Sequence, residues 1–323
     1  MAQHREIGDV APTSLAHLIG QRSVVEQVRV ALDAAHQDAK TFDHALLVGP
    51  PGVGKTQTAK VVALEMAADF HEVLGQAVQS PADLNALLLG AKDRDVILVD
   101  EAHELDREFQ TALYLAVDQR RVLLPSRGRT PQAIPLADFT LLLATTDEFR
   151  LLQPLRDRMR LSLRFGFYSS DELGELTRQR AAALGWDVDV NVFAPIAARS
   201  RGTPRLALRL LQACRRVCRS EGEGRITPTH LDRACLLEET DALGLGPTEQ
   251  QYLAVLGDGA NRLNVISSRL GLPVRTVAEV TEPFLIRVGL VAKDDQGRRQ
   301  LTAEGRAHFV SNSRNPGVWI EEH

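Results

Sequence analysis

The stretch GPPGVGKT at residues 49–56 constrains the fold more than any other part of the sequence. It satisfies the pattern G-x-x-x-x-G-K-[ST] and lies between an apolar run, HALLV at 44–48, and a helical pattern. A loop of this kind points successive backbone N–H groups and a helix N-terminus at phosphate oxygens. The sequence therefore predicts a strand, a phosphate-binding loop and a helix, in that order.

Two more short apolar runs follow, VILV at 96–99 and FTLLLA at 139–144. Unbroken runs of this length are typical of strands that are buried on both faces of a parallel sheet. Helices must then cover the two faces of that sheet. The first half of the chain is therefore predicted to be an α/β domain built around the phosphate-binding loop.

Strand signals stop near Ser169, and four helical segments are expected near 171–184, 189–200, 204–221 and 228–240. Ser169 and Glu172 have the spacing of a capping box, which would start the first of these helices.

The stretch LGLGP at 243–247 is expected to be a linker. Residues 248–309 predict three helices and then a short charged hairpin around KDDQGRR, the order of a winged helix. The last 14 residues are expected to fray.

Composition and charge exclude several classes of protein. The chain has 323 residues, 44% of them hydrophobic and 25% charged, which is an ordinary globular composition with enough apolar residues for a sizeable core. The formal net charge of −4 means that any contact with nucleic acid must come from a local basic surface. No secretory signal and no run of 18 apolar residues is visible, so we expect a cytoplasmic protein without a membrane contact.

The loop motif predicts a nucleotide site with ATP and Mg²⁺. Lys55 would reach the β- and γ-phosphates, and Thr56 would ligate the metal ion. The residues expected to hold the nucleotide are Gly49, Pro50, Pro51, Gly52, Val53, Gly54, Lys55, Thr56 and Gln57.

The run VILVDEAH supplies the second half of the same site. Asp100 follows a predicted strand, which places it at the carboxyl edge of the sheet, where its carboxylate can hold the Mg²⁺ hydration shell. Glu101 can then polarise the attacking water as a general base. Two adjacent acids are by themselves typical of a solvated strand end, but here they follow a phosphate-binding loop. His103 is given no catalytic role.

Five motifs in order, GPPGVGKT, VDEAH, LLATT, PLRDRM and RGTPR, resemble those of the AAA+ ATPases. More narrowly the chain resembles the RuvB family of Holliday junction branch-migration motors, from about Leu15 to Phe309, and EPFLIRVGLV is specific to that subfamily. The resemblance implies a P-loop AAA+ ATPase domain at 1–168, a helical lid at 169–243, a winged-helix DNA-binding domain at 244–310 and a tail at 311–323.

The resemblance also implies roles for residues outside the loop. Thr146, with Thr145 beside it, would be the sensor that orients the attacking water. Arg158 would be the finger that completes the site of a neighbouring subunit, where a guanidinium stabilises the γ-phosphoryl transition state, and Arg156 would orient its segment. An ordinary surface Arg-Asp-Arg cluster is the alternative for that pair. Arg205 would be the second sensor, reaching the γ-phosphate of its own subunit.

Three weaker assignments concern the adenine: Ile19, Gly20 and Tyr168 resemble positions around the base. Tyr168 is equally explained as a core aromatic residue at the domain joint.

Two surfaces depart from the family pattern. Residues 120–137 are predicted to form an inserted β-hairpin, which in the family carries an apolar tip that docks on RuvA, whereas the tip PSRGR at 125–129 is basic here. That tip would suit DNA phosphate or an acidic partner, or it is an ordinary turn. The wing carries two acids beside its arginines, so we expect a weaker grip on DNA. The expected DNA contacts are Arg269, Arg275, Arg298 and Arg299.

The expected function is an ATP-dependent DNA motor, an ATP hydrolase that works as a hexameric ring to drive branch migration of Holliday junctions in recombination and repair. Two alternatives stay open at this point. A RuvB-like paralog would act on another DNA structure or on a protein, and a nucleotide-gated scaffold would bind DNA with incidental turnover.

Overall fold

The computed structural model of the chain describes residues 7, 10–124 and 132–314. The chain divides into two compact units. The first comprises residues 1–176 with 203–205, and the second comprises 177–202 with 206–323.

The first unit is built on a parallel sheet of five strands in the order β2-β3-β6-β1-β7. The three apolar runs of the sequence form its centre, as predicted. The strands are β1 (Ala45–Val48), β2 (Phe70–Leu74), β3 (Val96–Asp100), β6 (Thr140–Thr145) and β7 (Leu161–Arg164). Every residue of β6 is buried. Phosphate-binding sites form at the carboxyl edge of such a sheet, and the loop after β1 lies there.

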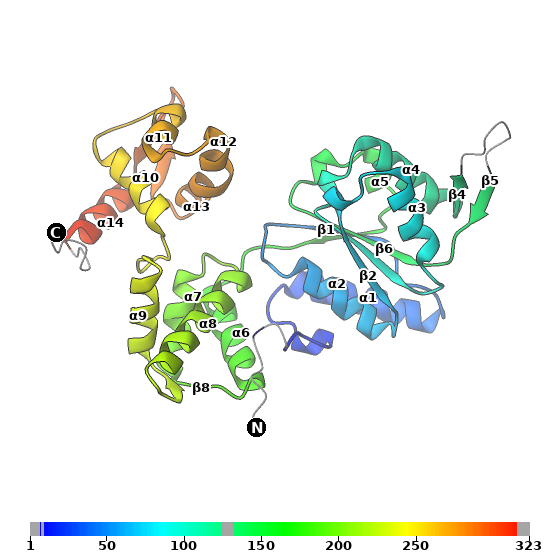
Figure 1. Cartoon of the computed structure of the whole chain (residues 1–323), viewed down its shortest axis with the longest axis horizontal. Helices are drawn as coiled ribbons and strands as arrows, with labels where there is room; N and C mark the ends of the chain where they lie inside the picture. Colours follow the sequence, from blue (N-terminus) through cyan, green and yellow to red (C-terminus); the bar gives the residue numbers. More distant parts are fainter. Residues whose placement is uncertain (1–6, 8–9, 125–131, 315–323) are drawn as a thin grey trace. The chain divides into compact units, whose positions relative to one another are not determined.

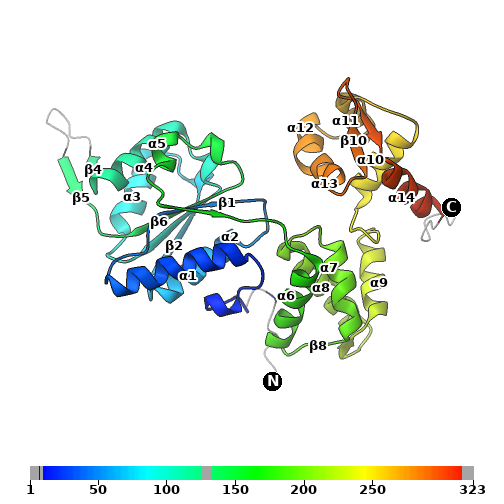
Figure 2. The ribbon, with the colours of Figure 1, turned by 180° about the vertical axis from the view of Figure 1, so that it is seen from behind.

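Alternate residues of each central strand belong to two separate hydrophobic cores, one on each face of the sheet. In β3, Val96 and Leu98 pack with α1 and α2, whereas Ile97 and Val99 pack with α3 and α4. This alternation is the geometric consequence of the strand's two-residue period. Both faces are therefore covered, by α1 (Arg22–Gln37) and α2 (Lys55–Glu65) on one and by α3 (Pro81–Gly90), α4 (Arg107–Gln119) and α5 (Gln153–Arg156) on the other (Figures 1 and 2). Four short turns complete the unit: η2 (Leu15–His17), η3 (Gly75–Ala77), η4 (Ala102–Glu104) and η5 (Glu148–Arg150).

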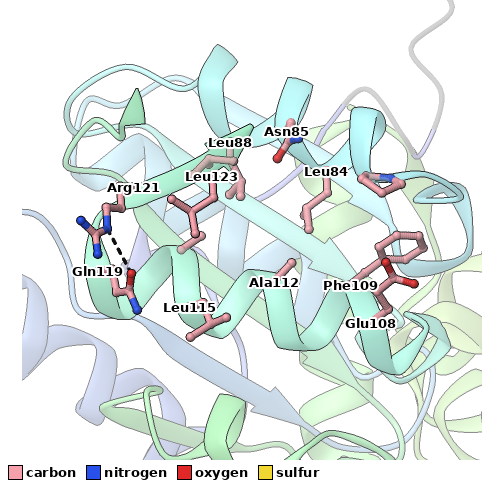
Figure 3. Close-up of a pocket in the computed structure, with 13 residues that line it drawn as sticks. Leu84, Asn85, Leu88, Glu108, Phe109, Ala112, Leu115, Gln119, Arg121 and Leu123 are labelled. Carbon is pink, nitrogen blue, oxygen red and sulfur yellow. Dashed lines mark hydrogen bonds between the residues drawn. The ribbon is translucent and has the colours of Figure 1, made fainter. Parts of the chain in front are cut away.

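The inserted hairpin is present where the sequence predicts it. Strands β4 (Arg121–Leu124) and β5 (Gln132–Pro135) pair antiparallel. The basic tip at 125–129 lies outside the described residues. At the root of the hairpin, an apolar groove of about 220 Å³ runs between α3 and α4, and Leu84, Leu88, Phe109, Leu115 and Leu123 are among the side chains that line it (Figure 3).

The helical segments predicted after Ser169 are found in the structure with small changes. Helix α6 (Ser170–Ala183) begins with the expected capping box: the N–H of Glu172 donates to Ser169 Oγ at 3.2 Å, and Glu172 Oε2 accepts from the N–H of Ser169 at 2.9 Å. The segment expected at 189–200 is a turn, η6 (Val190–Val192), followed by α7 (Phe193–Arg199). The remaining elements are α8 (Pro204–Ser220), α9 (Pro228–Leu237) and the two short parallel strands β8 (Asp187–Val188) and β9 (Arg225–Ile226).

The C-terminal module has the helices and the charged hairpin that the sequence predicts. Its core is formed by residues such as Leu245, Tyr252, Ile266 and Leu285. The elements are α10 (Pro247–Gly257), α11 (Leu263–Leu270), α12 (Val274–Thr276), η7 (Val277–Thr281), α13 (Glu282–Arg287), β10 (Val291–Lys293), β11 (Arg299–Leu301) and α14 (Ala303–Arg314).

The expectation of a frayed tail from residue 310 is wrong for part of that stretch, because α14 continues to Arg314. The helix is capped at its start, where Thr302 Oγ1 accepts from the N–H of Gly305 at 2.9 Å. Residues 315–323 lie outside the described part of the chain. Among the described helices, none is long and apolar enough to cross a membrane.

Candidate active site

The phosphate-binding loop leaves β1 and enters α2 through two glycines in the left-handed region. Gly52 has φ +78° and Gly54, which precedes the first residue of α2, has φ +100°. Side chains with a Cβ rarely adopt these angles, so glycine is required for the turn that presents the start of α2 to a ligand. Pro51 is exposed at the loop surface, and Pro50 and Thr56 are half-buried.

Lys55 lies inside this loop and is 6% exposed. Its Nζ donates to the carbonyl oxygens of Gly49 at 2.7 Å and Pro50 at 3.0 Å. Burial lowers the pKa of Lys55, the charges of Glu101 and Asp100 act to raise it, and the charge of Arg205 lowers it further. The four charged groups that the sequence assigns to one site therefore surround the same loop.

Asp100 ends β3 directly opposite Thr56. Thr56 Oγ1 donates to Asp100 Oδ2 at 2.7 Å, and Asp100 Oδ1 accepts from the N–H of Glu101 at 2.9 Å. Hydroxyl and carboxylate oxygens are the hard ligands that Mg²⁺ prefers, and the ion usually keeps several waters beside one or two carboxylates. The pair of side chains fits such an ion.

Glu101 follows in a left-handed conformation with φ 49°, which is uncommon for a residue with a side chain. Its Oε2 is buried and accepts no hydrogen bond within the described structure. Nδ1 of His103 lies 3.4 Å from this oxygen. A carboxylate oxygen that is held out of the solvent without a donor is a candidate acceptor for a water proton.

His103 is the residue near the site that the sequence analysis missed. Its Nδ1 lies 3.1 Å from Thr145 Oγ1, and its Nε2 lies 3.2 Å from Glu104 Oε1. Nδ1 is also the atom that lies near Glu101 Oε2, so His103 connects the end of β3 to the end of β6. The DEAH string was the available signal, but sequence spacing alone does not show that the imidazole contacts Glu101.

The two threonines at the carboxyl end of β6, Thr145 and Thr146, differ in their surroundings. Thr145 is fully buried, and its Oγ1 accepts from the N–H of Asp147 at 3.0 Å. Thr146, the predicted sensor, is exposed just beyond the carboxyl end of the strand. It stands at the same sheet edge as Asp100, so its role as sensor stays a prediction.

Arg205 lies in the first turn of α8 and above the phosphate-binding loop. Its N–H donates to the Gly52 carbonyl oxygen at 3.4 Å. A Cβ at Gly52 would lie 3.0 Å from Cβ of Arg205 and 3.6 Å from its Nε, so the absence of a side chain there lets the arginine lie against the loop. The role of Arg205 as second sensor stays a prediction.

Tyr168 and Gly20 are in contact beside the loop. The hydroxyl of Tyr168 donates to the Val53 carbonyl oxygen at 3.3 Å, and a Cβ at Gly20 would lie 2.7 Å from the tyrosine ring. Burial raises the pKa of Tyr168 to about 12. Ile19 is half-buried next to Gly20, and Gln57 Oε1 is buried without a hydrogen bond in the described structure. The tyrosine also packs on the core of α1 and α2, so both interpretations of it stay open.

Arg158 contacts residues of α4 and α5. Its Nε and Nη2 both lie 3.2 Å from Asp118 Oδ1, its Nη1 donates to the Pro154 carbonyl oxygen at 3.4 Å, and its guanidinium lies 5.6 Å from the centre of the Tyr114 ring. The side chain is 34% exposed. Arg156 lies 5.5 Å from the centre of the Phe149 ring, and Phe149 is 79% exposed.

Each of the four arginines expected to contact DNA is already paired with an acid. Arg298 pairs with Asp294 at 2.8 Å, Arg269 with Asp258 at 3.0 Å, and Arg275 with Glu279 at 2.9 Å. These three are 43%, 49% and 78% exposed.

Arg299 differs from the other three. It is 14% exposed and donates from Nε and Nη2 to both oxygens of Glu282, which is 3% exposed. Its guanidinium is therefore occupied inside the module, and a contact with DNA is disfavoured for it.

In comparisons with known proteins, all three parts of the chain match domains of the same family. The family models described as the Holliday junction DNA helicase RuvB P-loop domain, the RuvB AAA lid domain and the RuvB C-terminal winged helix domain match residues 10–165, 168–241 and 242–310. The Holliday junction branch migration complex subunit RuvB of Anaeromyxobacter sp. (strain K) is 37% identical over 299 residues, which are 90% of this chain and 87% of that protein. The subunit of the same name from Mycolicibacterium vanbaalenii is 37% identical over 305 residues, 92% of this chain and 86% of that protein.

Solved structures agree with the sequence comparison. The structure of the Thermotoga maritima RuvB Holliday junction branch migration motor superposes with a TM-score of 0.80 and 31% identity, over 93% of this chain and 97% of that one. These matches confirm the predicted fold class, a P-loop AAA+ domain with a helical lid and a C-terminal winged helix. The chain belongs to the RuvB family.

Proposed function

We propose that this chain is an ATP hydrolase that drives branch migration of Holliday junctions. The observation that carries the proposal is the convergence of Lys55, Thr56, Asp100, Glu101 and Arg205 on one phosphate-binding loop. The related proteins are described as subunits of the Holliday junction branch migration complex, and the match extends over nine-tenths of this chain. The winged helix at the C-terminus supports DNA as the substrate on which the motor acts.

Within one subunit the residues have separate tasks. The N–H groups of the loop and the ammonium of Lys55 bind the phosphates, for which Nζ exchanges its present acceptors, the carbonyl oxygens of Gly49 and Pro50. Glu101 accepts the proton of the attacking water at its unpaired Oε2. Thr146 orients that water, and Arg205 contacts the γ-phosphate.

Thr56 and Asp100 would hold Mg²⁺. When bound, the ion neutralises charge on the β- and γ-phosphate oxygens. The same two side chains bond each other at 2.7 Å, which places both oxygens together for one ion.

A ring of subunits, six by the resemblance, completes the chemistry. Arg158 contacts Asp118 and Tyr114, and the charged groups that shift the pKa of Lys55 are Glu101, Asp100 and Arg205. We therefore assign it to the nucleotide of the neighbouring subunit, where its guanidinium stabilises the transition state.

Two surfaces would recruit the other components of the complex. Arg298, Arg269 and Arg275 are exposed cations of the winged-helix module and suit DNA phosphate. A RuvA-like partner would bind at the hairpin of β4 and β5. The apolar groove at its root, where Leu115 is 39% and Leu123 is 55% exposed, supports an apolar contact there (Figure 3).

The deciding experiment is the ATP turnover rate with four-way-junction DNA, with and without a RuvA protein. A linear duplex of the same base composition is the matched control for DNA that lacks a branch. We expect junction DNA to raise turnover and RuvA to raise it further, with migration of the branch point in the same mixture. Turnover that ignores junction DNA while the branch point stays in place would contradict the proposal and favour a paralog with another substrate.

A further inference from the structure

Arg201 lies four residues before Arg205 and in the turn between α7 and α8. Its backbone is in the left-handed region, with φ 50°, and its side chain is directed at the start of the C-terminal module. Nε and Nη2 donate to the Gly244 carbonyl oxygen at 2.8 and 2.6 Å. Nη1 donates to Glu249 Oε1 at 2.7 Å, and the two side chains are only 21% and 11% exposed.

A second element of the C-terminal module contacts the same arginine. The Arg201 guanidinium lies 4.8 Å from the centre of the Phe284 ring in α13. Arg287, also in α13, donates to the Arg201 carbonyl oxygen at 2.6 Å, and its own guanidinium lies 5.2 Å from the same ring. Arg201 is thus held through its side chain and its backbone by α10, by α13 and by the segment that precedes α10.

The segment expected as a linker, 243–247, follows the boundary between the lid and the winged helix, and it is fixed by contacts of its own. A Cβ at Gly244 would overlap the Arg199 carbonyl group, so the chain passes too close there for any side chain. Asp241 Oδ1 accepts from the N–H groups of Leu243 and Leu245 at 2.9 and 2.8 Å. Asp241 Oδ2 is 2.8 Å from both His308 Nε2 and Asn312 Nδ2, on α14.

These contacts have the properties of a rigid joint. A planar guanidinium that bonds a carbonyl, a carboxylate and an aromatic face at once has one orientation that satisfies all three partners. The pair is largely out of the solvent, so separating it would leave a charge unpaired in a poorly hydrated place. The lid and the winged helix therefore resist independent rotation about residues 238–246.

We propose that Arg201 is a positioning residue that locks the winged-helix module to the lid, so that both follow the helix that carries Arg205. The inference rests on the proposed function, because Arg205 is assigned there to the γ-phosphate. Helix α8 is continuous from Pro204 to Ser220. A displacement of Arg205 on hydrolysis would then move α8, and Arg201 would carry that movement to the part of the chain that contacts DNA.

The test uses the full chain with Arg201→Gln as the main variant. Arg287→Gln is a milder second variant at an exposed side chain, in case the first fails to fold. Arg209→Gln is the matched control, since Arg209 is 60% exposed and its ion pair, with Glu238, stays within the lid. Spin labels at Arg216 in α8 and Val280 in η7, both exposed, report the distance between lid and winged helix by electron paramagnetic resonance.

We expect a narrow distance distribution in the unsubstituted chain and in Arg209→Gln, and a broad one in Arg201→Gln and Arg287→Gln. The stimulation of ATP turnover by junction DNA should fall by about tenfold or more in Arg201→Gln, while basal turnover without DNA is unchanged. A narrow distribution in Arg201→Gln, or stimulation that survives in it, overturns the proposal, and so does an equal loss of basal turnover. Failure of the proposed function itself is distinguishable, because the unsubstituted chain would then show no stimulation while the distances still report on the joint.

Discussion

The charged residues of the nucleotide site and those of the winged-helix module differ in how they are paired. At the phosphate-binding loop, Lys55 is held by backbone carbonyls and Glu101 keeps an unpaired carboxylate oxygen, so both have capacity for a ligand. In the winged helix, the four arginines expected to contact DNA each have an acidic partner already. The phosphate-binding loop can therefore accept a ligand directly, whereas the winged-helix arginines must break their ion pairs before they bind one.

The two regions differ because one depends on backbone geometry and the other on the position of acidic side chains. A phosphate-binding loop works through backbone geometry, which the order strand, glycine loop and helix nearly dictates. A basic surface depends on which acids lie nearby in space, and those are set by tertiary packing. The loop is therefore expected to tolerate little substitution, whereas single arginines of the winged helix contribute modestly to DNA affinity.

The largest effect is expected at Arg158. Arg158→Ala should lower ATP turnover by on the order of 10³-fold, because the guanidinium stabilises charge on the transferred phosphoryl group. ATP binding should persist, since the loop, Asp100 and Arg205 are untouched. Turnover is measured together with nucleotide affinity.

Mixing subunits tests whether Arg158 acts on a neighbour. Arg158→Ala and Lys55→Ala chains are each expected to be inactive alone, but a mixed ring contains interfaces with every catalytic group. Recovered turnover on mixing supports action between subunits. Mixed rings that form by crosslinking and stay inactive would show that Arg158 acts within its own chain or only supports the fold, and would favour the scaffold alternative.

The next effect in size belongs to Glu101. Glu101→Gln should bind ATP but turn it over at least about 10²-fold more slowly, because the amide cannot accept the proton of the attacking water. His103→Ala is the informative companion, since the imidazole contacts Glu101 without being assigned to the nucleotide. Normal turnover in Glu101→Gln would remove the general-base assignment.

The fold class and much of the phosphate-binding loop could be predicted from the sequence, because both depend on residues that are close together along the chain. The three central strands follow from apolar runs, the alternation in β3 follows from a two-residue period, and the glycine positions follow from the loop motif, whereas the order of the five strands was not predicted. The contact of His103 with Glu101, the ion pair of Arg299 with Glu282 and the joint at Arg201 could not be predicted. Each joins residues that are placed by packing, and in the last two the partners stand 17 and 48 positions apart.

A third prediction sharpens the comparison inside the winged helix. Arg299→Gln should lower the free energy of unfolding by about 2 kcal/mol, less than the roughly 3–5 kcal/mol of a fully orphaned buried charge, because Lys293 still lies near Glu282. Denaturant unfolding of the full chain gives this value, with Arg298→Gln as the exposed neighbour for control. Equal stability of the two variants would show that the Arg299 pair has no structural role and would restore Arg299 as a DNA contact.

The smallest effects are expected for DNA binding by the exposed arginines. Arg298→Gln, Arg269→Gln and Arg275→Gln should each weaken duplex binding equally for different sequences, because phosphate contacts carry no base information. Each substitution that removes a phosphate contact should reduce the magnitude of the slope of log affinity against log salt by about 0.9. The reduction should be smaller where the internal acid competes with DNA for the guanidinium.

Arg298 faces the strongest competition, since Asp294 is 17% exposed and also accepts the N–H groups of Gln296 and Arg298 at 2.9 and 2.8 Å. Arg275, at 78% exposed with an i,i+4 partner, is the freest to turn toward a phosphate and should show the fullest slope change of the three. Slopes that stay unchanged in all three variants would place the DNA contact elsewhere on the chain, and Arg127 and Arg129 of the hairpin tip, which lie outside the described residues, would then be substituted next.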